Sequence, residues 1–132
     1  MLAQYARAYK SVAVTTATPG QLVLMLFDGA LRFISGALHG FEQENFSRRI
    51  EIVHTNSIKT QKILRELQCS LDLKQGGEFA QRMYALYDFM IDQLMKSNIS
   101  KDPEPMLVVQ DLLGQIRGAW SEMLEQSVAK AA

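Results

Sequence analysis

The stretch from residue 18 to residue 38 constrains the fold of this chain more than any other. It begins as a helix should, because Thr18 is a capping residue, Pro19 suits the first helical position and Gln21 completes a capping box. Apolar residues then recur at helical spacing along two neighbouring lines. The line predicted to face the core is Leu22, Leu26, Gly29, Phe33 and Ala37, and the line beside it is Val23, Phe27, Ile34 and Leu38. A helix this apolar is predicted to be central, or to face a partner as well as the core.

Three further helices are predicted, over residues 46–69, 77–96 and from 103 to near the C-terminus. Asn45 or Ser47 can cap the first of these, and Asp102 followed by Pro103 is a typical start for the last. In the helix over 77–96, the predicted core line is Phe79, Met83, Leu86, Met90 and Leu94, with a second apolar flank at Tyr84, Tyr87, Ile91 and Met95.

Helices joined by short loops, without strand-like alternation, predict an all-α fold: an antiparallel up-and-down four-helix bundle over residues 18–132. The first 17 residues contain Leu2, Tyr5 and Tyr9, which are unfavourable to leave in water. They are predicted to form a short, partly mobile segment that docks on the bundle as a cap.

Composition bounds the kind of protein. The 132 residues are 48% hydrophobic and 21% charged, as in a single soluble domain. Fourteen basic residues balance 14 acidic ones, so the sequence offers no basic excess for binding nucleic acid or an anionic membrane. Cys69 is the only cysteine, which excludes an intrachain disulfide and favours a reduced, cytoplasmic location. No uninterrupted apolar run reaches the ~18 residues of a membrane span, so stable membrane insertion is not expected.

The residues that carry chemistry form no catalytic pattern. A di-iron bundle needs two Glu-x-x-His motifs, and this chain has one, Glu51 to His54. The methionines at core spacing are typical of packing rather than of haem ligation. No metal, no cofactor and no enzymatic activity are therefore predicted. What remains is surplus apolar surface on three helices, which either broadens the core or forms a groove for an amphipathic partner segment.

Three blocks of the sequence, taken in order, resemble one family. The block from Ala17 to Phe33, reading Ala-Thr-Pro-Gly-Gln-Leu-Val-Leu-Met-Leu-Phe-Asp-Gly-Ala-Leu-Arg-Phe, is similar to the opening helix of FliS, the bacterial flagellar secretion chaperone. The block from Gly76 to Met90 resembles the third-helix signature of that family, and the segment from Leu112 to Trp120 resembles its ending.

The resemblance implies a cytosolic, non-enzymatic export chaperone. Such a protein binds the disordered C-terminal region of flagellin, prevents premature polymerisation and keeps flagellin competent for type III flagellar export. The complex of chaperone and client is further expected to dock on the flagellar export gate. The alternative, from the pattern of residues alone, is a generic helical adaptor for another amphipathic segment.

Six residues are predicted to bind the partner. The resemblance aligns Leu2 and Tyr5 with apolar and tyrosine positions of an N-terminal segment that takes part in the client site. The other four, chosen because they lie off the predicted core lines, are Phe27, Ile34, Tyr87 and Ile91.

Overall fold

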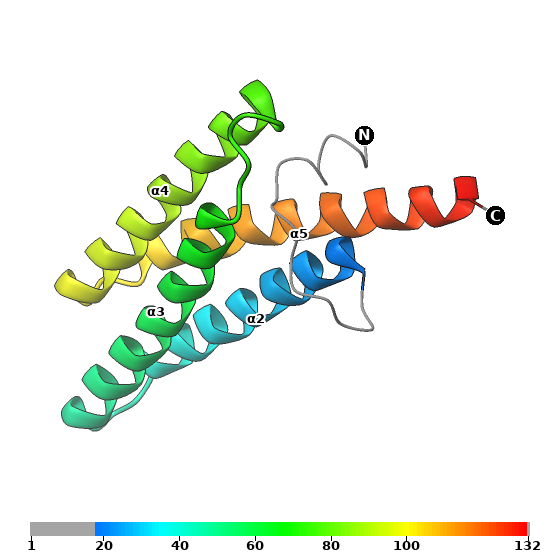
Figure 1. Cartoon of the computed structure of the whole chain (residues 1–132). Helices are drawn as coiled ribbons and strands as arrows, with labels where there is room; N and C mark the ends of the chain where they lie inside the picture. Colours follow the sequence, from blue (N-terminus) through cyan, green and yellow to red (C-terminus); the bar gives the residue numbers. More distant parts are fainter. Residues whose placement is uncertain (1–17, 132) are drawn as a thin grey trace.

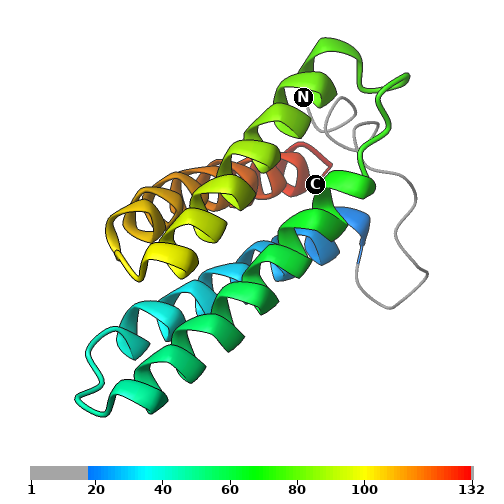
Figure 2. The same cartoon turned by 90° about the vertical axis from the view of Figure 1, so that its left-hand side faces the viewer.

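The structure, a computed structural model, describes residues 18–131, with the side chains of residues 18–127. These residues form four helices: α2 (Pro19–Gly40), α3 (Phe46–Cys69), α4 (Gly77–Ser100) and α5 (Glu104–Ala131). Consecutive helices run in opposite directions, and α5 returns to pack on α2, so that the contacts close a ring (Figure 1). Viewed from the side, α3 and α4 lie in front of α2 and α5 (Figure 2). The predicted antiparallel four-helix bundle is confirmed for this part of the chain.

The helix starts are where the capping residues predict them. Thr18 Oγ1 accepts a hydrogen bond from the backbone N–H of Gln21, and the Gln21 side chain accepts one from the N–H of Thr18, which completes the capping box. Asn45 caps α3 by accepting from the N–H of Arg48 at 2.9 Å. The carboxylate of Asp102 accepts from the N–H of Glu104 at the start of α5.

Helix α4 is one turn longer than predicted. The prediction ended it at residue 96, but it continues to Ser100 and stops where Lys101 adopts a left-handed conformation with φ of 54°. Ser97, predicted to lie in a turn, is buried, and its hydroxyl donates to the backbone carbonyl of Asp102. Ser97 therefore does not end the helix, because its hydroxyl is hydrogen-bonded to the turn that follows α4.

The predicted core line of α2 is confirmed at Gly29 and Ala37, which are buried, but is wrong at its three large side chains. Leu22, Leu26 and Phe33 are partly exposed, whereas Val23, Phe27 and Ile34 from the neighbouring line are buried. Ala30 and Ala37 lie between these large side chains and are fully buried. Because both lines are equally apolar, side-chain type alone did not show which one faces the bundle axis.

Helices α2 and α3 approach each other closely because glycines of α2 face α3. A Cβ atom at Gly40 would lie 2.7 Å from Ile52 Cγ2 and 3.1 Å from the backbone nitrogen of Val53. A Cβ at Gly36 would lie 2.8 Å from Asn56 Oδ1. The absence of side chains at these two positions sets the distance between the two helices.

Helix α5 is fixed to α2 by an aromatic and an ionic contact. Trp120 donates a hydrogen bond to the carbonyl oxygen of Gly20 at 2.8 Å and packs edge-to-face on Phe27, with ring centroids 6.2 Å apart. Arg117 Nε donates to Asp28 Oδ1 at 2.7 Å, and this hydrogen bond raises the pKa of Arg117 above its usual value. Beyond these contacts, the last turns of α5 extend past the start of α2 (Figure 1).

Among the described helices, α2 alone has the length and composition of a membrane span. The sequence has no uninterrupted apolar run of this length, so the membrane-span composition of α2 was not predicted. Of its apolar window, 33% is buried inside the bundle, including Val23, Phe27 and Ile34, and a core helix of a helical bundle has the same composition.

The packing of α2 on α3 gives the first prediction. Gly40→Ala should lower the free energy of unfolding by about 1–3 kcal/mol, because the new methyl group meets the branched side chains of Ile52 and Val53 and the backbone nitrogen of Val53. Urea denaturation followed by circular dichroism measures the change.

The matched control is Gly114→Ala on α5, where a Cβ atom meets nothing within 4 Å. This substitution should stabilise the protein by up to about 1 kcal/mol, because alanine favours a helix over glycine. Equal effects of the two substitutions would contradict the close packing of α2 on α3.

Candidate functional site

The structure places the predicted partner-binding residues in two groups. Phe27, Ile34 and Tyr87 are fully buried, and Ile91 is 4% exposed. The off-line positions chosen from the sequence thus belong to the core of the bundle, and they form no groove that is open to solvent in this conformation. Leu2 and Tyr5 lie outside the described residues.

The exposed apolar surface that the structure does offer is concentrated on α4. Tyr84, Met95 and Ile99 lie on one face of this helix, at intervals of 11 and 4 residues, and Ile99 is 81% exposed. Phe89 adds a fourth exposed apolar side chain to α4. The other large exposed apolar side chains of the described residues are Leu107 and Val108 at the start of α5, and Met25, Phe46 and Leu73 elsewhere.

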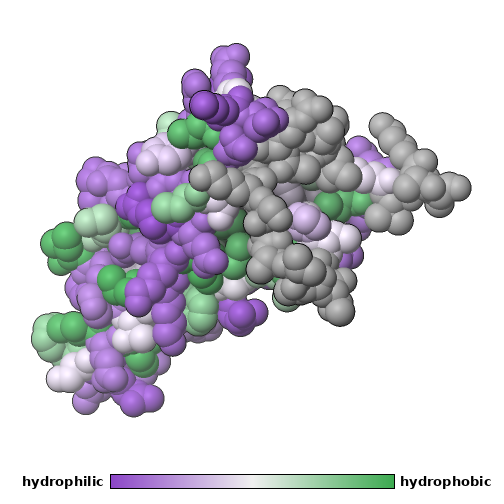
Figure 3. Space-filling model, viewed as in Figure 1, coloured by the Kyte–Doolittle hydropathy of each residue, from purple (hydrophilic) through white to green (hydrophobic). Residues whose placement is uncertain are grey.

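This face of α4, defined by Tyr84, Met95 and Ile99 and called here the α4 stripe, is interrupted by polar residues. Asp88 lies one turn after Tyr84, and Asp92 pairs with Lys96 at 3.1 Å. Over α3 and α4, the space-filling view accordingly shows separate apolar areas among hydrophilic ones (Figure 3). An elongated surface with apolar side chains at intervals suits an extended or helical partner segment better than a small molecule.

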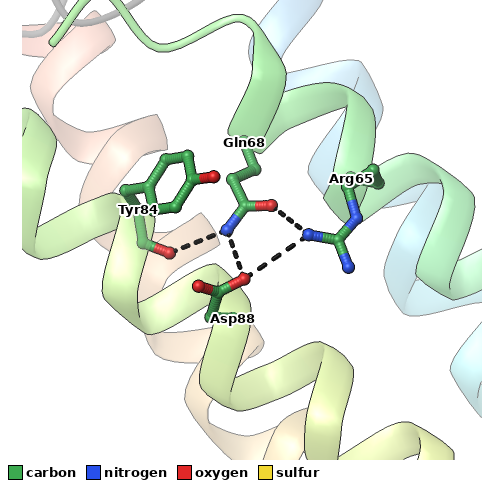
Figure 4. Close-up of polar contacts among 4 residues, drawn as sticks. All are labelled: Arg65, Gln68, Tyr84 and Asp88. Atoms are coloured by element: carbon green, nitrogen blue, oxygen red, sulfur yellow. Dashed lines mark hydrogen bonds and ion pairs between the residues drawn. The ribbon is translucent and has the colours of Figure 1, made fainter.

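A buried amide holds the α4 stripe against α3. Gln68 is 1% exposed, and its Nε2 donates to the carbonyl oxygen of Tyr84 at 3.0 Å and to Asp88 Oδ1 at 2.7 Å (Figure 4). Arg65 Nη1 donates to Gln68 Oε1 at 2.5 Å and lies 3.4 Å from Asp88 Oδ1. These contacts join the end of α3 to the first half of α4 and fix which face of α4 points outward.

The sequence analysis missed the role of Gln68. It directly follows Leu67 near the end of α3, where a polar residue is expected to face water. Arg65, Glu66 and Ser70 close to it are polar as well, so the sequence around Gln68 gives no signal of its burial. A buried polar side chain of this kind is recognised only once its partners on another helix are known.

The described residues contain no group of three or more His, Cys, Asp or Glu side chains placed to hold a metal ion. The motif from Glu51 to His54 lies on α3, and the His54 ring contacts Asn98 rather than a second acidic or histidine residue. Cys69, at the last residue of α3, is exposed.

Together, the four-helix bundle and the exposed apolar side chains of the α4 stripe are typical of a helical protein-binding module. The family model described as flagellar protein FliS matches residues 1–127, and the chain belongs to the FliS family. This is a family of chaperones and not of enzymes.

Several relatives carry the name flagellar secretion chaperone FliS. The protein of Bacillus subtilis is 36% identical over 118 residues, which cover 89% of this chain and 84% of the relative. The protein of Salmonella typhimurium is 33% identical over 126 residues, covering 90% and 86%. The protein of Escherichia coli is 33% identical over 120 residues, covering 91% and 86%.

The hydrogen bonds of Gln68 give the second prediction. Gln68→Ala should lower the free energy of unfolding by about 1–3 kcal/mol, because it removes buried packing and leaves the carboxylate of Asp88 and the carbonyl of Tyr84 without their shared donor. Thermal and urea denaturation measure the loss.

Gln115→Ala is the control, since Gln115 is exposed on α5 and bonds only locally to Asp111 among the contacts described. Its effect should stay within about 0.5 kcal/mol. If Gln68→Ala were equally mild, the amide would not hold α4 in place.

Proposed function

We propose that this chain is a flagellar secretion chaperone that binds the C-terminal region of flagellin. In this role it prevents premature polymerisation and keeps flagellin competent for type III flagellar export. Membership of the FliS family supports the proposal. The structural observation that carries it is the α4 stripe, because such exposed apolar side chains on a small protein suit a protein partner.

The dimensions of the α4 stripe suit a disordered client. Tyr84 and Ile99 are separated by about 22 Å along the helix axis, from a rise of about 1.5 Å per residue. A disordered segment loses conformational entropy when it binds, so it gains affinity by spreading over a long surface rather than by filling one pocket. Met95 adapts its shape to different side chains, and Tyr84 combines apolar area with a polar hydroxyl.

Leu2 and Tyr5 remain part of the proposed client site, on the basis of the family resemblance. The other four predicted residues are not proposed as direct contacts because their side chains are buried: Phe27, Ile34, Tyr87 and Ile91. They would contact the client only if a neighbouring helix or segment moved; otherwise they act indirectly, by supporting the outer faces of α2 and α4. The proposed direct contacts are therefore the α4 stripe and the N-terminal residues.

The location and the second partner belong to the same proposal. A chaperone that meets flagellin before export works in the cytoplasm, where the single cysteine, Cys69, would remain reduced. The complex with flagellin would then dock on the flagellar export gate. The family resemblance supports this step.

Binding of a peptide from the C-terminal region of flagellin gives the third prediction. Titration calorimetry should show saturable binding with a negative heat-capacity change, and circular dichroism should show newly formed helix. The double substitution Met95→Ala and Ile99→Ala should weaken binding at least about tenfold, because it removes two exposed apolar contacts from the α4 stripe.

Met25→Ala is the control, since Met25 is also an exposed methionine but lies on α2. It should leave the affinity unchanged, and the variants should keep the melting temperature of the wild type. Equal affinity for an unrelated amphipathic peptide would contradict the chaperone proposal and favour a generic helical adaptor. Loss of binding with Met25→Ala alone would move the client site to α2.

The N-terminal residues give the fourth prediction. Tyr5→Ala should weaken binding of the flagellin peptide while leaving the melting temperature unchanged, since the family resemblance assigns this residue to the client site. The same titration and a thermal scan measure both quantities. A large loss of stability with unchanged affinity would assign Tyr5 to the structure of the bundle instead.

A further inference from the structure

Three polar side chains meet at the corner where the end of α4 passes α3. His54 on α3 lies with its Nδ1 atom 2.9 Å from Nδ2 of Asn98 on α4. Lys101, the residue that ends α4, donates from its Nζ to Asn98 Oδ1 at 2.5 Å. The amide of Asn98 thus joins α3 to the turn between α4 and α5, and nothing in the proposed function uses this contact.

The donor and acceptor roles in this corner are fixed by Lys101. A lysine ammonium has three N–H donors and no acceptor, so the Asn98 oxygen must face it. The amide NH₂ of Asn98 then faces His54 and can only donate. His54 Nδ1 must therefore accept, which requires a neutral imidazole with its proton on Nε2.

Protonation of His54 would place an N–H group against the NH₂ of Asn98. The amide cannot rotate to present its oxygen to the imidazolium without losing the hydrogen bond from Lys101. Lowering the pH keeps Lys101 a donor, even though partial burial lowers its pKa. We infer that the corner of His54, Asn98 and Lys101 is an acid-sensitive latch between α3 and the α4–α5 turn, closed when His54 is neutral and broken when it is protonated.

The other charged groups at this corner do not replace the latch. Glu51 lies one turn before His54 on α3 and is exposed. The histidine–carboxylate pair that the described residues form is His39 with Glu42, at the C-terminal end of α2. The carboxylate of Asp102 is already bound to the N–H of Glu104. Pairing of protonated His54 with Glu51 would lie within α3 and would not join α3 to the turn after α4.

The sign of the pH dependence follows from these roles. The latch contributes stability while His54 is neutral, and this contribution is lost when acidification protonates His54. Other groups contribute to the pH dependence as well, but the wild type and Lys101→Gln share both histidines and all carboxylates. Differences between the pH profiles of variants therefore isolate the latch.

The first test is Asn98→Asp, studied by urea denaturation of the full chain at about pH 8 and about pH 5.5. A carboxylate at position 98 accepts from both Lys101 and protonated His54, so it should reverse the sign of the contribution. The urea midpoint of Asn98→Asp should fall less than that of the wild type on acidification, or rise. An equal or larger fall would overturn the inference.

The second test removes the constraint on the amide. In Lys101→Gln the side chain at 101 can donate or accept, so Asn98 is free to turn its oxygen towards protonated His54. Lys101→Gln and His54→Asn should both lose less stability on acidification than the wild type, whereas His39→Asn should lose at least as much, because His39 pairs with Glu42 when it is protonated. If Lys101→Gln kept the full wild-type pH dependence, the latch as described would be wrong.

Discussion

The close packing of α2 against α3 is the contact on which the rest of the bundle depends. Gly36 and Gly40 let the two helices approach until side chains of α3 touch the backbone of α2. At that distance, Val23, Phe27 and Ile34 of α2 are buried in the core. At the first turn of α2, Trp120 of α5 donates a hydrogen bond to the carbonyl oxygen of Gly20. Helix α2 is thus fixed by close glycine packing against α3 on one flank and by Trp120 and the Arg117–Asp28 pair of α5 on the other.

Helix α4 is held by buried apolar side chains, among them Tyr87 and Leu94, and also by polar contacts. Its contacts with α3 include several polar ones: Gln68 reaches Tyr84 and Asp88 near one end, and Asn98 reaches His54 near the other. Hydrogen bonds specify orientation without burying much apolar surface. The outer face of α4 can therefore carry Tyr84, Met95 and Ile99 in contact with solvent while the helix remains in place.

The sequence predicted the number and starts of the helices well because these depend on local chemistry. Thr18 and Asn45 cap their helices through side-chain atoms within three residues, so their role is visible in the sequence. The buried faces were predicted less well, because Leu22 and Val23 are equally apolar and the choice between them depends on where α3 and α5 lie. The prediction of four partner-binding residues rested on that assignment of faces: Phe27, Ile34, Tyr87 and Ile91. Since these side chains are buried, the proposed direct contacts are the exposed residues of the α4 stripe instead.

The central claim is that the client lies along the α4 stripe, and site-specific photo-crosslinking tests it most directly. A photoreactive amino acid would replace Met95 on α4 in one variant and Met25 on α2 in another, and each folded variant would be irradiated with the C-terminal region of flagellin. The account predicts an efficient crosslink from position 95 and little or none from position 25. Crosslinking from position 25 with none from position 95 would contradict it.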